Sequence, residues 1–96
     1  MNLGSEILSE VFRVIESRRK RPTTDSYVSG LMKAGLDQIL DKISEESEEL
    51  IVAAREEQRE NIIHETADLL FHAMILLAKK GVSIEDIYEE LKRRRR

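Results

Sequence analysis

The chain has 96 residues, of which 41% are hydrophobic and 36% are charged, and its formal net charge is −3. That length suits a single domain over residues 1–96. The absence of cysteine excludes disulfides, zinc ribbons, iron–sulfur clusters and thiol nucleophiles, and the absence of tryptophan argues against a stacking platform for nucleic acid. Without an apolar run of about 18 residues or a signal-peptide pattern, we expect a soluble, cytoplasmic protein that binds neither membranes nor nucleic acid.

The first third of the chain predicts two helices. Apolar residues between 7 and 15 recur at helical spacing, and Pro22 stops the helix that they define. A turn cluster over 23–26 then precedes a short helix that runs to Ala34, with Gly35 as the residue that follows its last turn. This segment therefore predicts a long helix, a turn and a short helix.

Two long helices are predicted next. Asp37 is a candidate N-cap for a helix that continues to about Arg59, and Asn61 is a candidate N-cap for a helix over 62–80. The second of these helices is apolar almost all round over 69–78. A helix of this kind is buried, or is held between its own core and a partner. In so short a chain, burial against a second copy is the economical solution.

A capping-box pattern, Ser83-x-x-Asp86, opens a terminal helix whose apolar residues Ile84, Ile87 and Leu91 are predicted to face inward. No strand signal is present. The sequence thus predicts an all-α domain of four to five helices that forms a helical bundle with a second subunit, as a homodimer or higher homo-oligomer.

Acidic residues recur at one-turn spacing in both long helices. Glu46 and Glu49 share one face of the first, and Glu65 and Asp68 repeat the spacing in the second. A glutamate run is more often a solvated face, but two antiparallel helices can gather four carboxylates around one point. Such crowding is tolerated only with a cation among them or with some groups protonated. Oxygen ligands favour Mg²⁺ first and Mn²⁺ second, and the lack of a Glu-x-x-His pattern at Glu46 or Glu65 argues against a di-iron site.

Two histidines follow the same helix. His72 lies one turn beyond Asp68, on the side predicted to face the metal, and is either a core histidine or part of the site. His64 is assigned to the start of the helix and is given no role.

The motif Lys42-x-x-Glu45-Glu46-x-x-Glu49, followed by Glu65-x-x-Asp68-Leu69-x-x-His72, resembles the phosphoribosyl-ATP pyrophosphatase family. That family belongs to the MazG-like all-α nucleoside-triphosphate pyrophosphatases. The resemblance covers nearly the whole chain and includes the Ser26-Tyr27 pair. This chain departs from the family pattern where Val28 replaces a usual threonine, where Ser44 and Ser47 replace glycine and alanine, and where Phe71 replaces tyrosine.

The resemblance implies hydrolysis of the α–β phosphoanhydride of phosphoribosyl-ATP to phosphoribosyl-AMP and pyrophosphate, the second step of histidine biosynthesis. It implies that Mg²⁺, with Mn²⁺ as a possible substitute, is bound by Glu46, Glu49, Glu65 and Asp68. Glu45 is the candidate for orienting the attacking water. The expected substrate contacts are polar or basic side chains: Lys42, Arg18, Ser26, Tyr27, His72 and Arg94, the last from either subunit.

Simpler interpretations remain open for these residues. Arg18 is equally explained as a helix-end charge, and Lys42 as an intrahelical partner of Glu45 or Glu46. Two other functions also fit the sequence: a housecleaning pyrophosphatase with the same metal chemistry, and a helical dimerisation or regulatory module whose acidic residues are merely solvated. A phosphoribosyl-AMP cyclohydrolase, which would catalyse the next step, is a possible functional partner.

Overall fold

The computed structural model describes the backbone of residues 3–95 and the side chains of residues 6–95. Within these residues the chain forms helices and no strands, which confirms the predicted all-α class. The five helices are α1 (Leu3–Lys20), α2 (Tyr27–Ala34), α3 (Leu36–Arg55), α4 (Arg59–Lys79) and α5 (Ile84–Arg94). None of them combines the length and the apolar character needed to cross a membrane.

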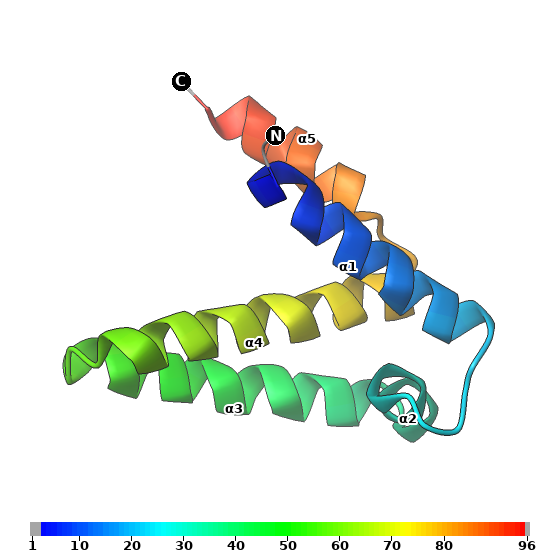
Figure 1. The fold of residues 1–96 in the computed structure, drawn as a ribbon, viewed down its shortest axis with the longest axis horizontal. Helices are drawn as coiled ribbons and strands as arrows, with labels where there is room; N and C mark the ends of the chain where they lie inside the picture. The colour runs from blue at the N-terminus through cyan, green and yellow to red at the C-terminus, as the bar shows by residue number, and fades with distance from the viewer. Residues whose placement is uncertain (1–2, 96) are drawn as a thin grey trace.

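A long antiparallel hairpin of α3 and α4 dominates the shape (Figure 1). Helices α1 and α5 lie side by side and meet the hairpin near the C-terminal end of α4, while the short α2 lies at the N-terminal end of α3. One end of the hairpin is therefore packed by three other helices. The other end, where α3 turns into α4, projects away from them.

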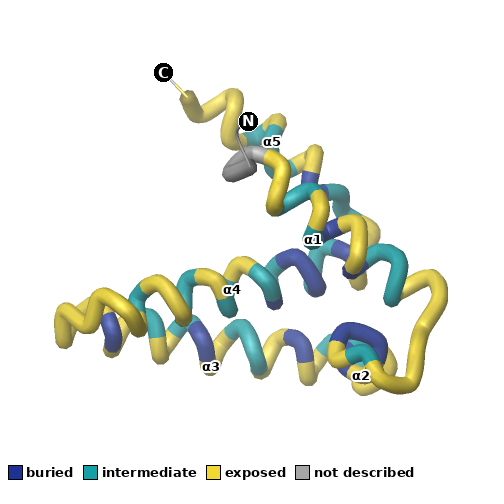
Figure 2. The backbone as a smooth tube through the Cα atoms, viewed as in Figure 1, coloured by how far each residue is buried: buried dark blue, intermediate teal, exposed yellow. Residues whose placement is uncertain are grey.

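The hydrophobic core lies at the packed end, where all five helices contribute. Its buried residues are Phe12, Ile15, Val28, Leu31, Ile39, Met74, Ile75, Ala78 and Ile84. Figure 2 shows that buried positions gather where the helices meet and that the projecting end is mostly exposed. There Ile51, Val52 and Ile63 are each about half exposed, at 49%, 50% and 52%.

Helix boundaries follow local chemistry at most junctions. Ser26 caps α2, since its hydroxyl accepts a hydrogen bond from the backbone N–H of Ser29 at 3.1 Å. Gly35 ends α2 with a φ of 107°, in the region that favours glycine. The predicted capping box is confirmed, because Ser83 and Asp86 exchange hydrogen bonds between side chain and backbone at the start of α5.

Two predicted caps are wrong. Helix α3 begins directly after Gly35, so Asp37 lies in its first turn, where an acidic side chain still favours the helix dipole. Helix α3 also ends at Arg55, earlier than predicted, and α4 begins at Arg59 after an N-cap at Gln58. The short connection of residues 56–58 places Asn61 inside α4, where its amide donates to the Gln58 side chain at 2.7 Å.

One prediction of burial fails within the single chain, and another is met along half of its helix. Leu91 is 58% exposed, because α5 packs on α1 through its earlier turns and Leu91 lies beyond that contact. Helix α4 is buried only along its C-terminal half, and Leu70 remains 48% exposed. The continuous apolar surface of α4 is therefore only partly covered by this chain's own helices.

Candidate active site

The middle of the α3–α4 hairpin brings the predicted acidic residues together. Glu46 and Glu49 come from α3, Glu65 and Asp68 come from α4, and the acids of α4 are close enough to influence those of α3. Glu46 is buried, with 6% of its surface exposed, whereas Glu65 and Asp68 are half-buried and Glu49 is exposed. The four carboxylates therefore extend from the edge of the core to solvent.

Glu46 and His72 are in contact across the two helices. Nδ1 of His72 lies 2.7 Å from Oε1 of Glu46, and each side chain is only 7% exposed. Burial raises the pKa of Glu46, as does the charge of Asp68, while His72 and Lys42 oppose this rise. Glu46 is therefore a buried carboxylate that is influenced both by the cation Lys42 and by the acid Asp68.

Glu49 and Glu65 are the second contact across the hairpin. The pKa of Glu49 is raised chiefly by a hydrogen bond shared with Glu65, and the charges of Glu65 and Asp68 raise it further, while Lys42 opposes the rise. When both carboxylates are ionised, neither supplies a proton for such a bond. The pair is then repulsive and favours either a shared proton or a cation.

Two buried carboxylate oxygens lack a hydrogen-bond donor in the described part of the chain: Oε1 of Glu46 and Oε1 of Glu65. The His72 contact does not satisfy the first, because the Nδ1–H direction favours the backbone carbonyl of Asp68, 3.0 Å away. Buried polar atoms in native proteins almost always have a partner. These two oxygens come from different helices, Glu46 from α3 and Glu65 from α4, and a bound cation would satisfy either of them.

An open cleft of about 430 Å³ adjoins these carboxylates. Glu45, Glu49 and Glu65 lie on its wall, so two of the proposed ligands and the proposed water-orienting residue share one solvent-accessible space. The cleft thus offers an approach to the acidic cluster from the projecting end of the hairpin.

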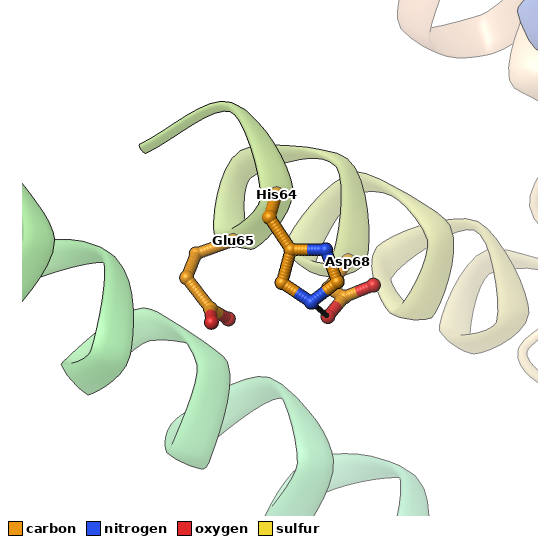
Figure 3. A group of neighbouring side chains, drawn as sticks. All are labelled: His64, Glu65 and Asp68. Carbon is orange, nitrogen blue, oxygen red and sulfur yellow. Dashed lines mark ion pairs between the residues drawn. The ribbon is translucent and has the colours of Figure 1, made fainter. Parts of the chain in front are cut away.

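His64 also lies beside the acidic cluster, although its place at the start of the helix predicted no role for it. Its Nε2 atom is 3.2 Å from Oδ2 of Asp68, and the ligand atoms of His64, Glu65 and Asp68 lie within 4.8 Å of one another. Figure 3 shows the three side chains on one stretch of α4, with Glu65 extending toward α3. The spacing of four residues between His64 and Asp68 was the available signal. These donors fit a hard divalent ion such as Mg²⁺, and the imidazole suits Mn²⁺.

Tyr27 also reaches the site, because its hydroxyl oxygen lies 2.7 Å from Nε2 of His72. Its ring stacks against Phe71, with centroids 6.4 Å apart. Partial burial raises the pKa of Tyr27, as do Glu46 and other nearby acids, while Lys42 lowers it. Tyr27, Lys42, Glu46 and His72 therefore interact as neighbours.

Three of the residues that are predicted to bind the substrate interact with other groups in the single chain. The hydroxyl of Ser26 caps α2. Arg18 lies in the last turn of α1, and its carbonyl accepts a hydrogen bond from the Ser29 hydroxyl at 3.4 Å. Arg94 pairs with Glu90 at 3.0 Å on α5, which lies beside α1 and away from the middle of the hairpin (Figure 1).

Comparison with known proteins decides the family. The profile described as phosphoribosyl-ATP pyrophosphohydrolase matches residues 8–95. The chain belongs to this family. It is 44% identical to a phosphoribosyl-ATP pyrophosphatase of Geotalea daltonii over 96% of this chain and 87% of the relative. A phosphoribosyl-ATP pyrophosphatase of Methanococcoides burtonii is also 44% identical, over 93% of this chain and 92% of the relative.

Some members of the phosphoribosyl-ATP pyrophosphohydrolase family are longer. The histidine biosynthesis bifunctional protein HisIE of Gloeobacter violaceus is 46% identical over 96% of this chain, which spans 41% of that relative. Family membership confirms the expected enzyme class, phosphoribosyl-ATP diphosphatase, and the expected pathway, histidine biosynthesis. A purely structural dimerisation module is not what this family predicts.

Proposed function

We propose that the chain hydrolyses the α–β phosphoanhydride of phosphoribosyl-ATP in a Mg²⁺-dependent reaction at the α3–α4 hairpin, releasing phosphoribosyl-AMP and pyrophosphate. The observation that carries the site is the pair of buried, unpartnered oxygens of Glu46 and Glu65, one from each helix. Family membership supplies the substrate. Histidine biosynthesis would place the reaction in the cytoplasm.

Glu46, Glu49, Glu65 and Asp68 would hold Mg²⁺, with Mn²⁺ as a substitute. Support comes from the contact of Glu46 with His72 of α4 and from the raised pKa of Glu49, which Glu65 and Asp68 of α4 both raise. When bound, the ion would supply charge neutralisation on the diphosphate, which is the main requirement of phosphoryl-transfer chemistry. His64 is the additional donor that the structure places beside these acids.

Other side chains would bind and orient the reactants. Lys42 lies close enough to influence the pKa of both Glu46 and Glu49, which suits a point charge that also meets a phosphate oxygen. Glu45 is exposed on the cleft wall, where its carboxylate would orient a water and accept its proton. The hydroxyl of Tyr27 is occupied by His72, so its half-exposed ring is the part available to the substrate.

The remaining proposed substrate contacts are Ser26, Arg18 and Arg94, while His72, which is buried, would act on the substrate through its neighbours. Arg94 is exposed and distant from the hairpin within its own chain, so we place it at the site of a second copy. The half-exposed apolar residues of the hairpin, Ile51, Val52, Ile63 and Leu70, would be covered in that homodimer. Sedimentation of the native chain against the variant Ile63→Glu tests this, and a native chain that remains monomeric at all concentrations contradicts it.

A functional link with a phosphoribosyl-AMP cyclohydrolase is also proposed, because that enzyme would consume the phosphoribosyl-AMP formed here. The support is that relatives called bifunctional in histidine biosynthesis contain a region matching this chain, which spans 44% and 41% of two of them. Faster consumption of phosphoribosyl-AMP when the two proteins are mixed than when they act in sequence would support a physical association, and equal rates would contradict it.

The decisive assay measures pyrophosphate release from phosphoribosyl-ATP and from a panel of ordinary and damaged nucleoside triphosphates, with Mg²⁺ and with EDTA. We expect Mg²⁺-dependent release chiefly from phosphoribosyl-ATP. Equal or faster release from the other triphosphates would support the housecleaning alternative. Release that is indifferent to EDTA would contradict the metal-dependent mechanism.

A further inference from the structure

A partly buried chain of contacts connects α2 to the acidic cluster. The hydroxyl of Tyr27 lies 2.7 Å from Nε2 of His72, and Nδ1 of His72 lies 2.7 Å from Oε1 of Glu46. Both ring nitrogens of His72 are therefore engaged, on opposite sides of a residue that is only 5% exposed. Three helices meet at this imidazole.

The surroundings of His72 determine where its protons lie. Nδ1 faces two acceptors, the Glu46 carboxylate at 2.7 Å and the Asp68 carbonyl at 3.0 Å. Two acceptors at these distances require a proton on Nδ1, since a bare lone pair would repel both. In the neutral ring, Nε2 is then an acceptor. The Tyr27 hydroxyl, the group in contact with Nε2, therefore donates to it.

We infer that Tyr27 and His72 are positioning residues for Glu46: the Tyr27 hydroxyl holds the imidazole in the tautomer protonated at Nδ1, so that Nδ1 donates to the Asp68 carbonyl and the positive edge of the ring lies 2.7 Å from the Glu46 carboxylate and fixes this carboxylate for the metal. This inference rests on the proposed role of Glu46 as a ligand. Outer residues that orient a ligand in this way typically change metal affinity or activity by about 10- to 100-fold when removed.

The aromatic contacts of Tyr27 explain why its hydroxyl is held in place. Its ring stacks on Phe71 and meets the His72 ring edge-on, with centroids 6.4 and 5.7 Å away. Replacing Tyr27 by phenylalanine would keep these ring contacts and remove only the hydroxyl. The variant Tyr27→Phe is therefore a clean test of the hydrogen bond.

The experiment measures Mn²⁺ affinity by electron paramagnetic resonance in the absence of substrate. We expect Tyr27→Phe to weaken Mn²⁺ binding by roughly tenfold. Tyr88→Phe is the matched control, because the Tyr88 hydroxyl lies 3.0 Å from the Ser9 hydroxyl between α5 and α1, away from the hairpin. Both variants lose one partly buried tyrosine hydrogen bond, but only Tyr27→Phe should change the metal affinity.

Conservative variants of His72 separate its two nitrogens. An asparagine amide N–H can take the place of Nδ1–H, whereas a glutamine amide reaches the place of Nε2. We expect His72→Asn to retain most of the Mn²⁺ affinity and His72→Gln to lose it. The double variant Tyr27→Phe/His72→Asn should bind Mn²⁺ no more weakly than His72→Asn alone, since no imidazole is left to orient.

Nitrogen NMR of the His72 ring provides a readout that does not depend on metal. The native chain should show a protonated Nδ1 and an unprotonated Nε2, and Tyr27→Phe should mix the two tautomers. Unchanged Mn²⁺ affinity in Tyr27→Phe, or additive losses in the double variant, would overturn the inference while leaving the proposed function intact. If Glu46→Gln also retained native Mn²⁺ affinity, the ligand assignment itself would fail.

Discussion

The two ends of the α3–α4 hairpin differ in what covers them. At the packed end, Ile39 and Ile75 are fully buried beneath α1 and α2. At the projecting end, Ile51 and Ile63 are half exposed, although they belong to the same two helices. The acidic site lies between these ends. One end therefore stabilises the single chain, and the other is free to present charged groups and to receive a second copy.

Two substitutions in α4, one at each end of the hairpin, should differ most strongly in their effect on the stability of the protein. Ile75→Ala should lower the free energy of unfolding by about 2–5 kcal/mol, because it leaves a cavity in the core. Ile63→Ala should change it by about 0.5 kcal/mol or less at low protein concentration, where chains are single. Urea denaturation measures both changes in the free energy of unfolding. If Ile75→Ala does not fold, the milder variant Ile75→Val is measured in its place.

The effect of Ile63→Ala on stability should depend on protein concentration. If a second copy covers the projecting end, the effect of Ile63→Ala should grow as the concentration rises, while that of Ile75→Ala should stay constant. Equal losses for Ile63→Ala and Ile75→Ala at every concentration would contradict the distinction between the two ends.

At the boundary between the ends, Glu46→Gln should lower turnover by about 100-fold or more, since it removes a proposed metal ligand. In EDTA the same variant should be as stable as the native chain or slightly more stable, because burial raises the pKa of Glu46 and so disfavours its charge. Turnover and urea denaturation test the two parts. Glu60→Gln, at an exposed acid in the first turn of α4, is the control, and an active Glu46→Gln enzyme would contradict the assignment.

The stability of the protein without metal should depend on pH through Glu46 and Glu49. The pKa values of Glu46 and Glu49 lie above the ordinary 4.5, through burial and through the bond shared with Glu65 respectively. Without metal, their contribution to stability is complete below the unfolded pKa and is lost as the pH rises through the raised values. Mg²⁺ competes with these protons, so its effect on Tm should be larger at about pH 7.5 than at about pH 5.5. A pH-independent effect of Mg²⁺ would contradict this.

The removal of either of two helix caps should have a small effect on stability. Ser83→Ala should lower the free energy of unfolding by about 1 kcal/mol without changing kinetics, because it removes the cap of α5. Ser26→Ala should have a similar effect on stability through α2 and should also raise KM, if Ser26 contacts substrate. Thermal unfolding and steady-state kinetics measure these. An unchanged KM for Ser26→Ala would leave Ser26 as a cap only.

Much of the fold could be predicted from local sequence. Helical periodicity and the Ser83 capping box act over one or two turns, so the class, the number of helices and the start of α5 follow from neighbouring residues. That Asp37 and Asn61 lie inside α3 and α4, and do not cap these helices, could not be predicted. The start of each helix depends on how tightly Gly35 and the 56–58 connection turn the chain. Those turns are settled by the packing of α2, α3 and α4 together.

The site was only partly predictable for the same reason. One-turn spacing predicted which acids share a helix face, but not that Glu46 would be buried while Glu49 stays exposed. That difference reflects the position of each residue relative to the core, which the α1 and α2 contacts determine. The contact between Tyr27 and His72 joins residues 45 positions apart, and no local pattern reports it.

If acids from α3 and α4 bind one divalent ion together, a Mn²⁺ titration followed by electron paramagnetic resonance should reveal the contribution of each helix. Glu46→Gln and Glu65→Gln replace one carboxylate on each helix by a neutral amide, while Glu60→Gln changes an exposed acid in the first turn of α4. We expect Mn²⁺ binding to be strongly weakened in the first two variants and unchanged in the third. Equal binding by all three variants and the native chain would contradict it.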